Sequence, residues 1–483
     1  MKRTWIIAAM VGALLAGPAM AVDYIWSKDA ADSTWENPAN WILADGSAAT
    51  SFPNSLDDNA YINTRGIPGL SYDNEYCDPA WIPEVVISQE ITVGILKFGD
   101  GWHSDARLTV NNNITLNQFL PGALYGSGDF QFTMGAYTMR LVNNGDSPAK
   151  WDAGGANAWG WNISQSTIRF DGSGSFSPRY GAIYGDIYMT SSPANVVTLL
   201  GGARNEPQQN YPSVWDFGPG TVHMNGTLRT FGTVLTGGGT IDGDLAQGFG
   251  LTLSCWNQFL PSGVVGCTMW SDPWTGGGTY AMTGDLTAGL MDFRARYNNG
   301  MTIDATSDNY DLTLLTSLRL GEKMTLLAHD ATVTILAGTA ADDGNYAAKG
   351  LVLYGENSKI VAGNAVFNLY GSWDSSAADA DALDLGTSVI NLFGEGTLAT
   401  ADGQLVHALA FVSGSSYTLL SNVASDGGAL LLDGKLTSFD GLLNAGVLTL
   451  GGDYALTGFT EVPEPATMTL LALGGLALLR RRR

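Results

Sequence analysis

The sequence is poor in cysteine, histidine and basic residues. Its three cysteines form no C-x-x-C pair, so neither a dithiol redox centre nor a cysteine-based zinc site is expected. The four histidines stand singly, and neither an H-E-x-x-H, a G-x-S-x-G nor a phosphate-loop motif occurs. Lys and Arg number 23 against 46 Asp and Glu, and a formal charge of −23 repels phosphate backbones. We therefore expect no nucleic-acid partner.

Most of the chain alternates apolar and polar residues with a period of two. Leu108/Val110, Phe130/Phe132/Met134 and Ile187/Met189 each place apolar side chains on one face of a strand. Clusters of Asn and Gly, such as 111–113 and 237–239, separate these runs and tolerate tight turns. No stretch of 22–460 sustains a helical period with convincing caps. The body is therefore predicted to be all-β.

Residues 365–371 and 388–394 repeat one pattern at an offset of 23. The sequences AVFNLYG and SVINLFG share valine, asparagine, leucine and glycine, and this period fits one lap of a parallel β-solenoid. In that fold Asn368 would stack against Asn391, with the two amides hydrogen-bonded along the axis. We predict a β-helix-like parallel solenoid over 85–460; β-sandwich domains with two similar strands are the alternative.

The first 21 residues have the organisation of a secretory signal peptide. Lys2 and Arg3 precede the apolar run 5–15, and Ala19 and Ala21 form a small-x-small cleavage site. We expect cleavage after Ala21 and export through the inner membrane. An oxidising destination permits a disulfide between Cys255 and Cys267, which would leave Cys77 over.

The last 23 residues, 461–483, combine three features in order. The motif Val462-Pro463-Glu464-Pro465 is followed by the apolar run 466–479 and then by four arginines. Fourteen apolar residues in a helix rise about 21 Å, short of a hydrocarbon core of roughly 30 Å. We predict a short, marginal transmembrane helix with the arginines on the cytoplasmic side.

This tail resembles the PEP-CTERM sorting signal of Gram-negative bacteria. The resemblance implies recognition by an exosortase, processing near Pro463-Glu464-Pro465 and a transient anchor in the inner membrane. It also implies delivery to the cell surface or to the extracellular polysaccharide matrix of a biofilm. The tail is only about 5% of the chain, so the resemblance implies nothing about the activity of residues 22–460.

Residues 22–84 are rich in tryptophan and proline and are predicted to form an N-terminal cap or module. The spacing of Trp26, Trp35 and Trp41 resembles the opening of exported proteins with autotransporter-like β-repeats. The three rings would cover the exposed end of the solenoid, with their indole N–H groups hydrogen-bonded. The alternative is that these three rings stack on sugars at the surface.

Acidic clusters are the candidates for enzymatic or metal chemistry. Glycoside hydrolysis needs two carboxyl groups across a bound sugar, and Asp379 and Asp381 share one face of an extended strand. Neither has the aromatic and basic lining of a sugar groove, so we expect solvated loop acids, no catalytic residue, no metal site and no cofactor. Calcium is an open alternative because hard oxygen ligands gather in these clusters. The acidic clusters are Asp57/Asp58, Asp304/Asp308/Asp311, Asp342/Asp343 and Asp379/Asp381/Asp384.

These patterns together predict a protein of the cell envelope or extracellular matrix with a structural or adhesive role. Without its two terminal segments, the body has 17 basic and 44 acidic residues, a net charge of −27. Rows of Asn, Thr and Asp would face outward and present hydrogen-bonding groups to extracellular polysaccharide. We expect no enzymatic activity. The alternatives are a polysaccharide lyase or glycoside hydrolase on a β-helix, and a passive surface coat.

Overall fold

The chain is nearly all-β and divides into two compact units, residues 1–221 and 222–483. A computed structural model describes most of residues 21–460. The division falls inside the predicted body 85–460. The described residues are 21–71, 74–78, 80–99, 106–122, 131–152, 161–162, 166–177, 186–200, 203–204, 214–225, 227–231, 234–237, 239–243, 250–254, 258–260, 263–271, 278–282, 284–293, 301–305, 310–336 and 350–460.

The residues of the first unit that the structure describes form short strands and one 3₁₀ turn, η1 (Pro38–Asn40). Its strands are β1 (Val22–Trp26), β2 (Trp41–Leu43), β3 (Asp58–Ile62), β4 (Glu84–Ile87), β5 (Ile91–Phe98), β6 (Arg107–Val110), β7 (Ile114–Pro121), β8 (Gln131–Met134), β9 (Thr138–Leu141), β10 (Ala149–Asp152), β11 (Trp161–Asn162), β12 (Thr167–Phe170), β13 (Gly174–Ser177), β14 (Asp186–Tyr188), β15 (Val196–Leu200), β16 (Ala203–Arg204) and β17 (Val214–Asp216). Strand β18 (Thr221–Asn225) lies at the division.

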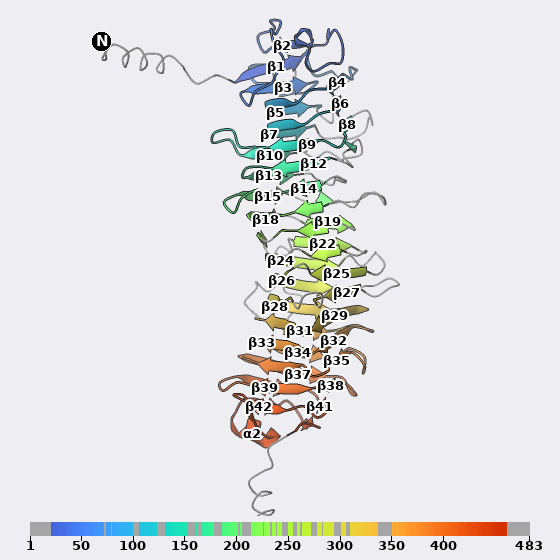
Figure 1. The fold of residues 1–483 in the computed structure, drawn as a ribbon, viewed down its shortest axis with the longest axis vertical. Coiled ribbons are helices and arrows are strands. Elements are labelled where there is room, and N and C mark those ends of the chain that lie inside the picture. The colour runs from blue at the N-terminus through green and yellow to red at the C-terminus, as the bar shows by residue number, and fades with distance from the viewer. Residues whose placement is uncertain are drawn as a thin grey trace, which may run out of the picture. The chain divides into compact units, whose positions relative to one another are not determined.

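Strands of the first unit form three parallel runs, which the chain visits in turn (Figure 1). One run contains the first halves of β5 and β7, then β9, β12, β14 and β17. The second contains β1, β3, the second halves of β5 and β7, then β10, β13 and β15. The third contains β4, β6, β8 and β11. Segment 22–84 thus begins the same sheets as the strands that follow it.

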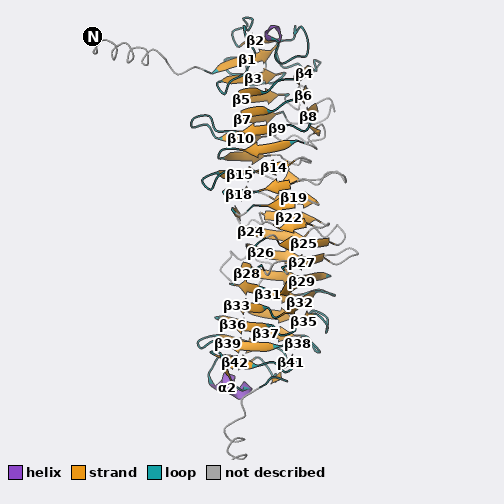
Figure 2. Cartoon of the chain, viewed as in Figure 1, coloured by secondary structure: helices purple, strands orange, loops and turns teal. Residues whose placement is uncertain are grey.

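The described part of the second unit contains the remaining strands and one short helix, α2 (Phe439–Asn444), which Figure 2 shows in purple. Its strands are β19 (Thr227–Phe231), β20 (Val234–Thr236), β21 (Thr240–Gly243), β22 (Gly250–Ser254), β23 (Gln258–Leu260), β24 (Gly263–Ser271), β25 (Gly278–Met282), β26 (Leu286–Phe293), β27 (Met301–Asp304), β28 (Leu312–Leu320), β29 (Met324–His329), β30 (Thr332–Ile335), β31 (Gly350–Leu353), β32 (Lys359–Gly363), β33 (Val366–Leu369), β34 (Ser372–Ser375), β35 (Leu383–Asp384), β36 (Val389–Leu392), β37 (Glu395–Thr400), β38 (Leu405–Val406), β39 (Ala408–Phe411), β40 (Ser416–Leu419), β41 (Val423–Ser425), β42 (Leu430–Leu432), β43 (Lys435–Leu436), β44 (Leu448–Leu450) and β45 (Leu456–Thr457).

The second unit repeats the arrangement of three parallel runs. The first run passes through β21, β24, β26, β28, β30, β33, β36, β39 and β42. The second passes through β19, β22, β24, β26, β28, β31, β34, β37, β40 and β44. The third passes through β20, β23, β25, β27, β29, β32 and β35, and β38, β41 and β45 form a short sheet of their own.

These parallel pairings confirm the all-β prediction and are compatible with the predicted solenoid. A sandwich of antiparallel hairpins would pair neighbouring strands of the chain, whereas Asn368 pairs with residues 34 and 23 positions away. Antiparallel pairing joins β1 to β2 and β42 to β43. Among these residues no helix is long and apolar enough to cross a membrane, and the predicted tail helix lies outside them.

Large aromatic side chains fill the interior of the first unit in successive laps. Phe98, Phe119, Trp151 and Phe176 are fully buried, and neighbouring ring centroids lie 5.5, 4.6 and 5.7 Å apart. Alternation along each strand sends these rings inward and the polar residues outward. Where β5 bends from one run to the next, a Cβ on Gly94 would lie 2.4 Å from the Leu56 carbonyl oxygen, so only glycine fits.

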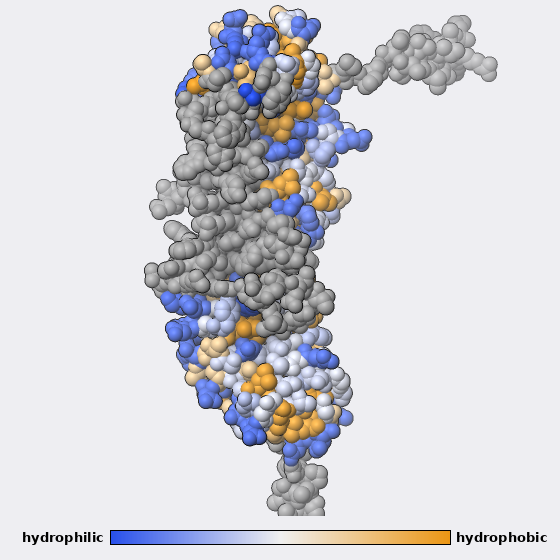
Figure 3. All heavy atoms as spheres, turned by 180° about the vertical axis from the view of Figure 1, so that it is seen from behind, coloured by the Kyte–Doolittle hydropathy of each residue, from blue (hydrophilic) through white to orange (hydrophobic). Residues whose placement is uncertain are grey.

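Three contacts cover the N-terminal strand edges of the first unit. Strand β2 pairs antiparallel with the outer edge of β1, and the backbone at Thr34 pairs with Val86 in β4. The Thr92 N–H of β5 donates to Oδ1 of Asn54, at 2.9 Å. An uncovered parallel edge would pair with another chain, so these contacts protect the end of the unit. Figure 3 shows hydrophilic and apolar residues interspersed over the described part of the face in view.

Candidate functional site

The three tryptophans predicted to cap the fold or to stack on sugars lie inside the first unit. Trp26, Trp35 and Trp41 are 2%, 0% and 1% exposed, and Trp41 makes edge-on contacts with the other two at 5.0 and 4.7 Å. The Trp35 indole N–H donates to the Pro53 carbonyl at 3.1 Å, and that of Trp41 to the Trp35 carbonyl at 2.8 Å. The indole hydrogen bonds agree with the cap prediction. The alternative prediction, that these three rings stack on sugars, is wrong, because the rings are buried and no ring face reaches solvent.

A polar loop around Asp32 holds part of segment 22–84 together. Its carboxylate accepts hydrogen bonds from Asn40 Nδ2, the Thr34 backbone N–H and Asn37 Nδ2 at 2.7, 2.8 and 2.9 Å. These donors, that of Asn40 first, lower the pKa of Asp32 from 3.8 to about 2. Asn40 itself is fully buried and also accepts from the Ala31 N–H, so the carboxylate orders the turn that leads into β2.

Replacing Asp32 by asparagine should destabilise segment 22–84 at neutral pH and make its stability less sensitive to acid. Because the folded pKa lies below the unfolded one, the carboxylate stabilises the fold above about pH 4, and this contribution is lost as pH falls toward 2. We expect Asp32→Asn to have a lower Tm than the wild type at pH 7, with the difference shrinking toward pH 2. Melting curves at pH 7, 4 and 2.5 measure this difference; a constant gap would contradict it.

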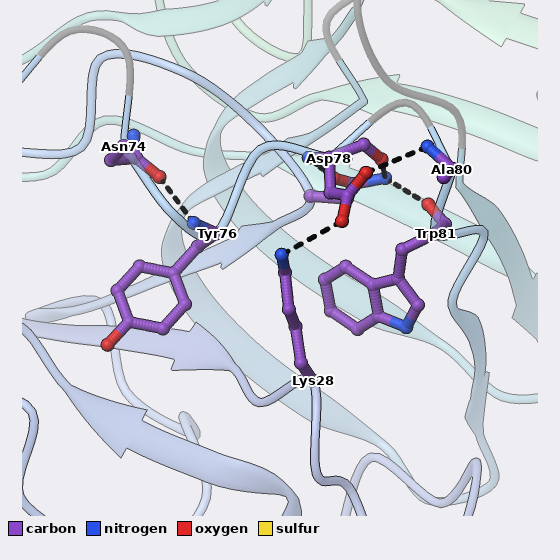
Figure 4. Close-up of polar contacts among 7 residues, drawn as sticks. Lys28, Asn74, Tyr76, Asp78, Ala80 and Trp81 are labelled. Carbon is purple, nitrogen blue, oxygen red and sulfur yellow. Dashed lines mark hydrogen bonds and ion pairs between the residues drawn. The ribbon is translucent and has the colours of Figure 1, made fainter.

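A second feature of the first unit is a surface formed by Lys28, Asp78 and Trp81, shown in Figure 4. Lys28 Nζ lies 3.0 Å from Asp78 Oδ2 and 6.0 Å from the centroid of the Trp81 ring. The loop is fixed by Asn63, whose Nδ2 donates to the Trp81 carbonyl at 2.6 Å and whose Oδ1 accepts from the Asp78 N–H. Hydrogen bonds from the Ala80 N–H and from Lys28 lower the pKa of Asp78. The half-buried indole offers apolar contact beside two charged groups.

Strands β30, β33 and β36 of the second unit present the amide ladder that the sequence predicted. Asn391 Nδ2 donates to Asn368 Oδ1 at 2.9 Å, and Asn368 Nδ2 donates to Thr334 Oγ1 at 3.2 Å. The three residues are register partners in successive laps and are half-buried. The predicted stacking of Asn368 and Asn391 is therefore confirmed.

An aromatic pair lies next to this ladder. The rings of Tyr370 and Phe393 stack with centroids 4.8 Å apart and an interplanar angle of 15°. Each ring follows its asparagine by two residues, so alternation places it on the same outward face. Tyr370 is 42% exposed. We name this surface, formed by Thr334, Asn368, Tyr370, Asn391 and Phe393, the amide–aromatic face. Its rings offer apolar contact to the C–H groups of a sugar, and its amides can bond hydroxyls.

Removing one amide from the ladder should cost stability in proportion to a single hydrogen bond. We expect Asn391→Ala to lower the free energy of unfolding by about 0.5–1.5 kcal/mol. Asn391→Asp should cost more, because a carboxylate oxygen would then face Asn368 Oδ1 in place of the donating amide. Urea unfolding of both variants measures the two values; an aspartate variant as stable as the wild type would contradict the ladder.

Several of the predicted acidic clusters have structural partners. Asp311 Oδ1 accepts from the Thr332 N–H at 2.9 Å, and Asp379 Oδ2 accepts from the Asn357 N–H at 2.7 Å, each in a neighbouring lap. Asp381 pairs with Lys359 at 2.6 Å, and this hydrogen bond lowers the pKa of Asp381. Asp308, Asp342 and Asp343 lie outside the described residues. In the part that the structure describes, no three His, Cys, Asp or Glu side chains come together to hold a metal ion.

A buried polar cluster in the second unit was missed by sequence analysis. Asp292 in β26 and Arg319 in β28 are register partners, 3% and 6% exposed. The Tyr354 hydroxyl donates to Asp292 Oδ1 at 2.7 Å from 62 residues away. Asp292 stands alone between apolar residues in the sequence, so only the register across laps reveals its neighbours.

Histidines of the second unit make contacts across laps. His223 Nδ1 lies 2.5 Å from Asp242 Oδ1, and His407 Nδ1 lies 2.7 Å from Asp426 Oδ1, each 19 residues on. Each of these two histidines therefore has a hydrogen-bonding partner, as a structural residue of a strand or loop would. Cys77 is half-buried, whereas Cys255 and the side chain of Cys267 lie outside the described residues, so their disulfide stays a prediction.

The tail is the part of the chain that matches a known family. Residues 461–483 match the family model of the PEP-CTERM protein-sorting motif. No curated protein and no solved structure matches the chain. The motif marks an exported, cell-surface-directed protein whose processing partner is an exosortase. Val462, Pro463, Glu464 and Pro465, like Ala19 of the signal peptide, lie outside the described residues; Ala21 directly precedes β1.

Proposed function

We propose that the chain is a structural and adhesive protein of the cell envelope or extracellular matrix that binds glycans without cleaving them. In this proposal each unit is a parallel β-solenoid whose strand faces display side chains at regular spacing. The tail delivers the protein, with a transient anchor in the inner membrane before an exosortase processes it. Extracellular polysaccharide of a biofilm is the proposed ligand.

The observation that carries this proposal is the amide–aromatic face. It combines stacked rings, one of them 42% exposed, with amides held in fixed positions by their own hydrogen bonds. Fixed polar groups beside an apolar ring are what sugar recognition requires, because they lose little freedom on binding. The Lys28–Asp78–Trp81 surface of the first unit offers a second combination of this kind.

The test is to incubate the purified full chain with a panel of neutral and acidic polysaccharides and to follow binding and product release together. We expect at least one polysaccharide to be retained with no new reducing ends and no unsaturated product over time. Sustained product release would overturn the proposal in favour of an enzyme. Failure to retain any polysaccharide would support a passive coat instead.

A glycoside hydrolase or polysaccharide lyase is the second candidate, and the Asp292 cluster favours it. A buried carboxyl group that accepts a tyrosine hydroxyl beside an arginine has the residue types of acid–base chemistry on an acidic sugar. If the panel yields products, Asp292→Asn should abolish their release. Asp152→Asn, which changes a part-exposed, ion-paired aspartate outside the predicted acidic clusters, is the matched control.

A further inference from the structure

Two arginines lie side by side on the outward face of the first unit. Strands β9 and β12 pair in parallel register, which places Arg140 next to Arg169 in the adjacent lap. Their side chains are 54% and 48% exposed. Neighbouring strands lie about 4.8 Å apart, so two guanidinium groups at this spacing repel each other unless an anion lies between them. In a body with only 17 basic residues, this pair is a local exception.

One carboxylate holds both arginines in place. Arg140 contacts Asp171 Oδ2 through Nε and Nη2, both at 2.7 Å, and Arg169 Nε contacts Oδ1 at 2.6 Å. Burial alone would raise the pKa of Asp171, but hydrogen bonds from Arg169 and Arg140 outweigh it and the pKa falls. The single negative charge of Asp171 therefore pairs with two positive charges, those of Arg140 and Arg169. Because Arg169 uses only Nε in these contacts, its two terminal nitrogens stay available to a ligand.

The residues around the pair complete a polar surface. Thr115 precedes Arg140 in the same run, and Tyr188 follows Arg169, each as a register partner one lap away. Two further acids face this surface from β14 and β17, and both already accept backbone hydrogen bonds. Asp186 Oδ1 accepts from the Val214 N–H at 2.7 Å, and Asp216 Oδ1 accepts from the Gly218 N–H at 2.8 Å.

We propose that Arg140 and Arg169 form a binding site for the carboxylate or sulfate groups of an acidic polysaccharide. Guanidinium groups fixed through Nε present planar pairs of donors that match a carboxylate or sulfate. The threonine and tyrosine hydroxyls in the same run can bond the sugar hydroxyls on either side. The proposal goes beyond the amide–aromatic face, because it rests on contacts within residues 1–221 alone. An experiment can therefore disprove binding at the arginine pair without disproving binding at the amide–aromatic face, and the reverse.

The test measures binding of the full chain to polygalacturonate and to the same polymer with its carboxyl groups methyl-esterified. We expect the charged polymer to bind at least about tenfold more tightly, with the difference shrinking as salt screens the charges. The double variant Arg140→Gln/Arg169→Gln should lose this preference. Lys150→Gln/Lys359→Gln removes two half-exposed, ion-paired charges elsewhere and should keep it within about threefold.

A single variant that keeps the Arg140–Asp171 contact tests the proposal even if the double variant does not fold. In Arg169→Gln alone, Arg140 still contacts Asp171, so the melting temperature should change little while binding weakens. Equal binding of the charged and esterified polymers would overturn the proposal. It would also be overturned if the lysine double variant lost the preference for the charged polymer as fully as the arginine double variant. Equally tight binding of duplex DNA would also overturn it, by showing a general polyanion surface.

Discussion

Replacing Trp41 by alanine should lower the free energy of unfolding by about 3–5 kcal/mol, one of the two largest effects expected in this chain. Its ring is 1% exposed and forms the centre of the contacts with Trp26, Trp35 and Tyr24. The substitution removes the centre of this buried aromatic cluster together with a hydrogen bond to the Trp35 carbonyl. Urea unfolding followed by intrinsic fluorescence and by circular dichroism measures the change.

Trp81→Ala is the matched control for this prediction, because Trp81 belongs to the same N-terminal segment but is only half-buried. We expect it to cost clearly less than Trp41→Ala. If the two variants were equally stable, the buried cluster would not be what holds segment 22–84 together.

Replacing Tyr417 should have the second large effect, within the second unit. The side chain is fully buried, and its hydroxyl lies 3.0, 3.0 and 2.9 Å from the carbonyl oxygens of Leu369, Gly371 and Phe393. Burial raises the pKa of the Tyr417 hydroxyl, so it remains a donor at all ordinary pH values. We expect Tyr417→Ala to cost about 3–5 kcal/mol and Tyr417→Phe, which removes only the hydroxyl, about 1–3 kcal/mol.

Chemical denaturation of both variants separates the ring from the hydroxyl. Tyr370→Phe removes a tyrosine hydroxyl from an exposed ring and should change stability by less than about 0.5 kcal/mol. A Tyr417→Phe variant as stable as the wild type would contradict a role for the hydroxyl in holding three laps together.

Sequence periodicity was sufficient to predict the strands and one contact between laps. Alternation identifies a strand because every second side chain must enter the core. The offset of 23 placed Asn368 against Asn391 because β33 and β36 pair without a register shift and their sequence patterns match residue by residue.

Most other contacts between laps could not be predicted because the laps differ in length. Asn368 pairs with Thr334 at an offset of 34, and His407 contacts Asp426 at an offset of 19. Without a constant period, nothing in the sequence indicates that Arg140 lies next to Arg169 or Asp292 next to Arg319. Only the register of the strands reveals these pairs.

Tryptophan content alone also left two interpretations of the N-terminal segment. A ring that caps a core and a ring that stacks on sugar are equally apolar, and only burial distinguishes them. Position outside a strand does not distinguish them either, because Trp35 and Trp81 both lie outside strands, yet Trp35 is fully buried and Trp81 only half-buried.

The most direct test of the proposed function compares two tyrosine variants on a polysaccharide that the full chain retains. Tyr370→Ala removes the exposed ring of the amide–aromatic face, whereas Tyr137→Ala removes a ring of similar exposure, 36%, from the first unit. We predict that Kd rises about tenfold or more for Tyr370→Ala and stays within about twofold for Tyr137→Ala. Unchanged affinity in both variants, with melting temperatures intact, would show that the amide–aromatic face does not bind the glycan.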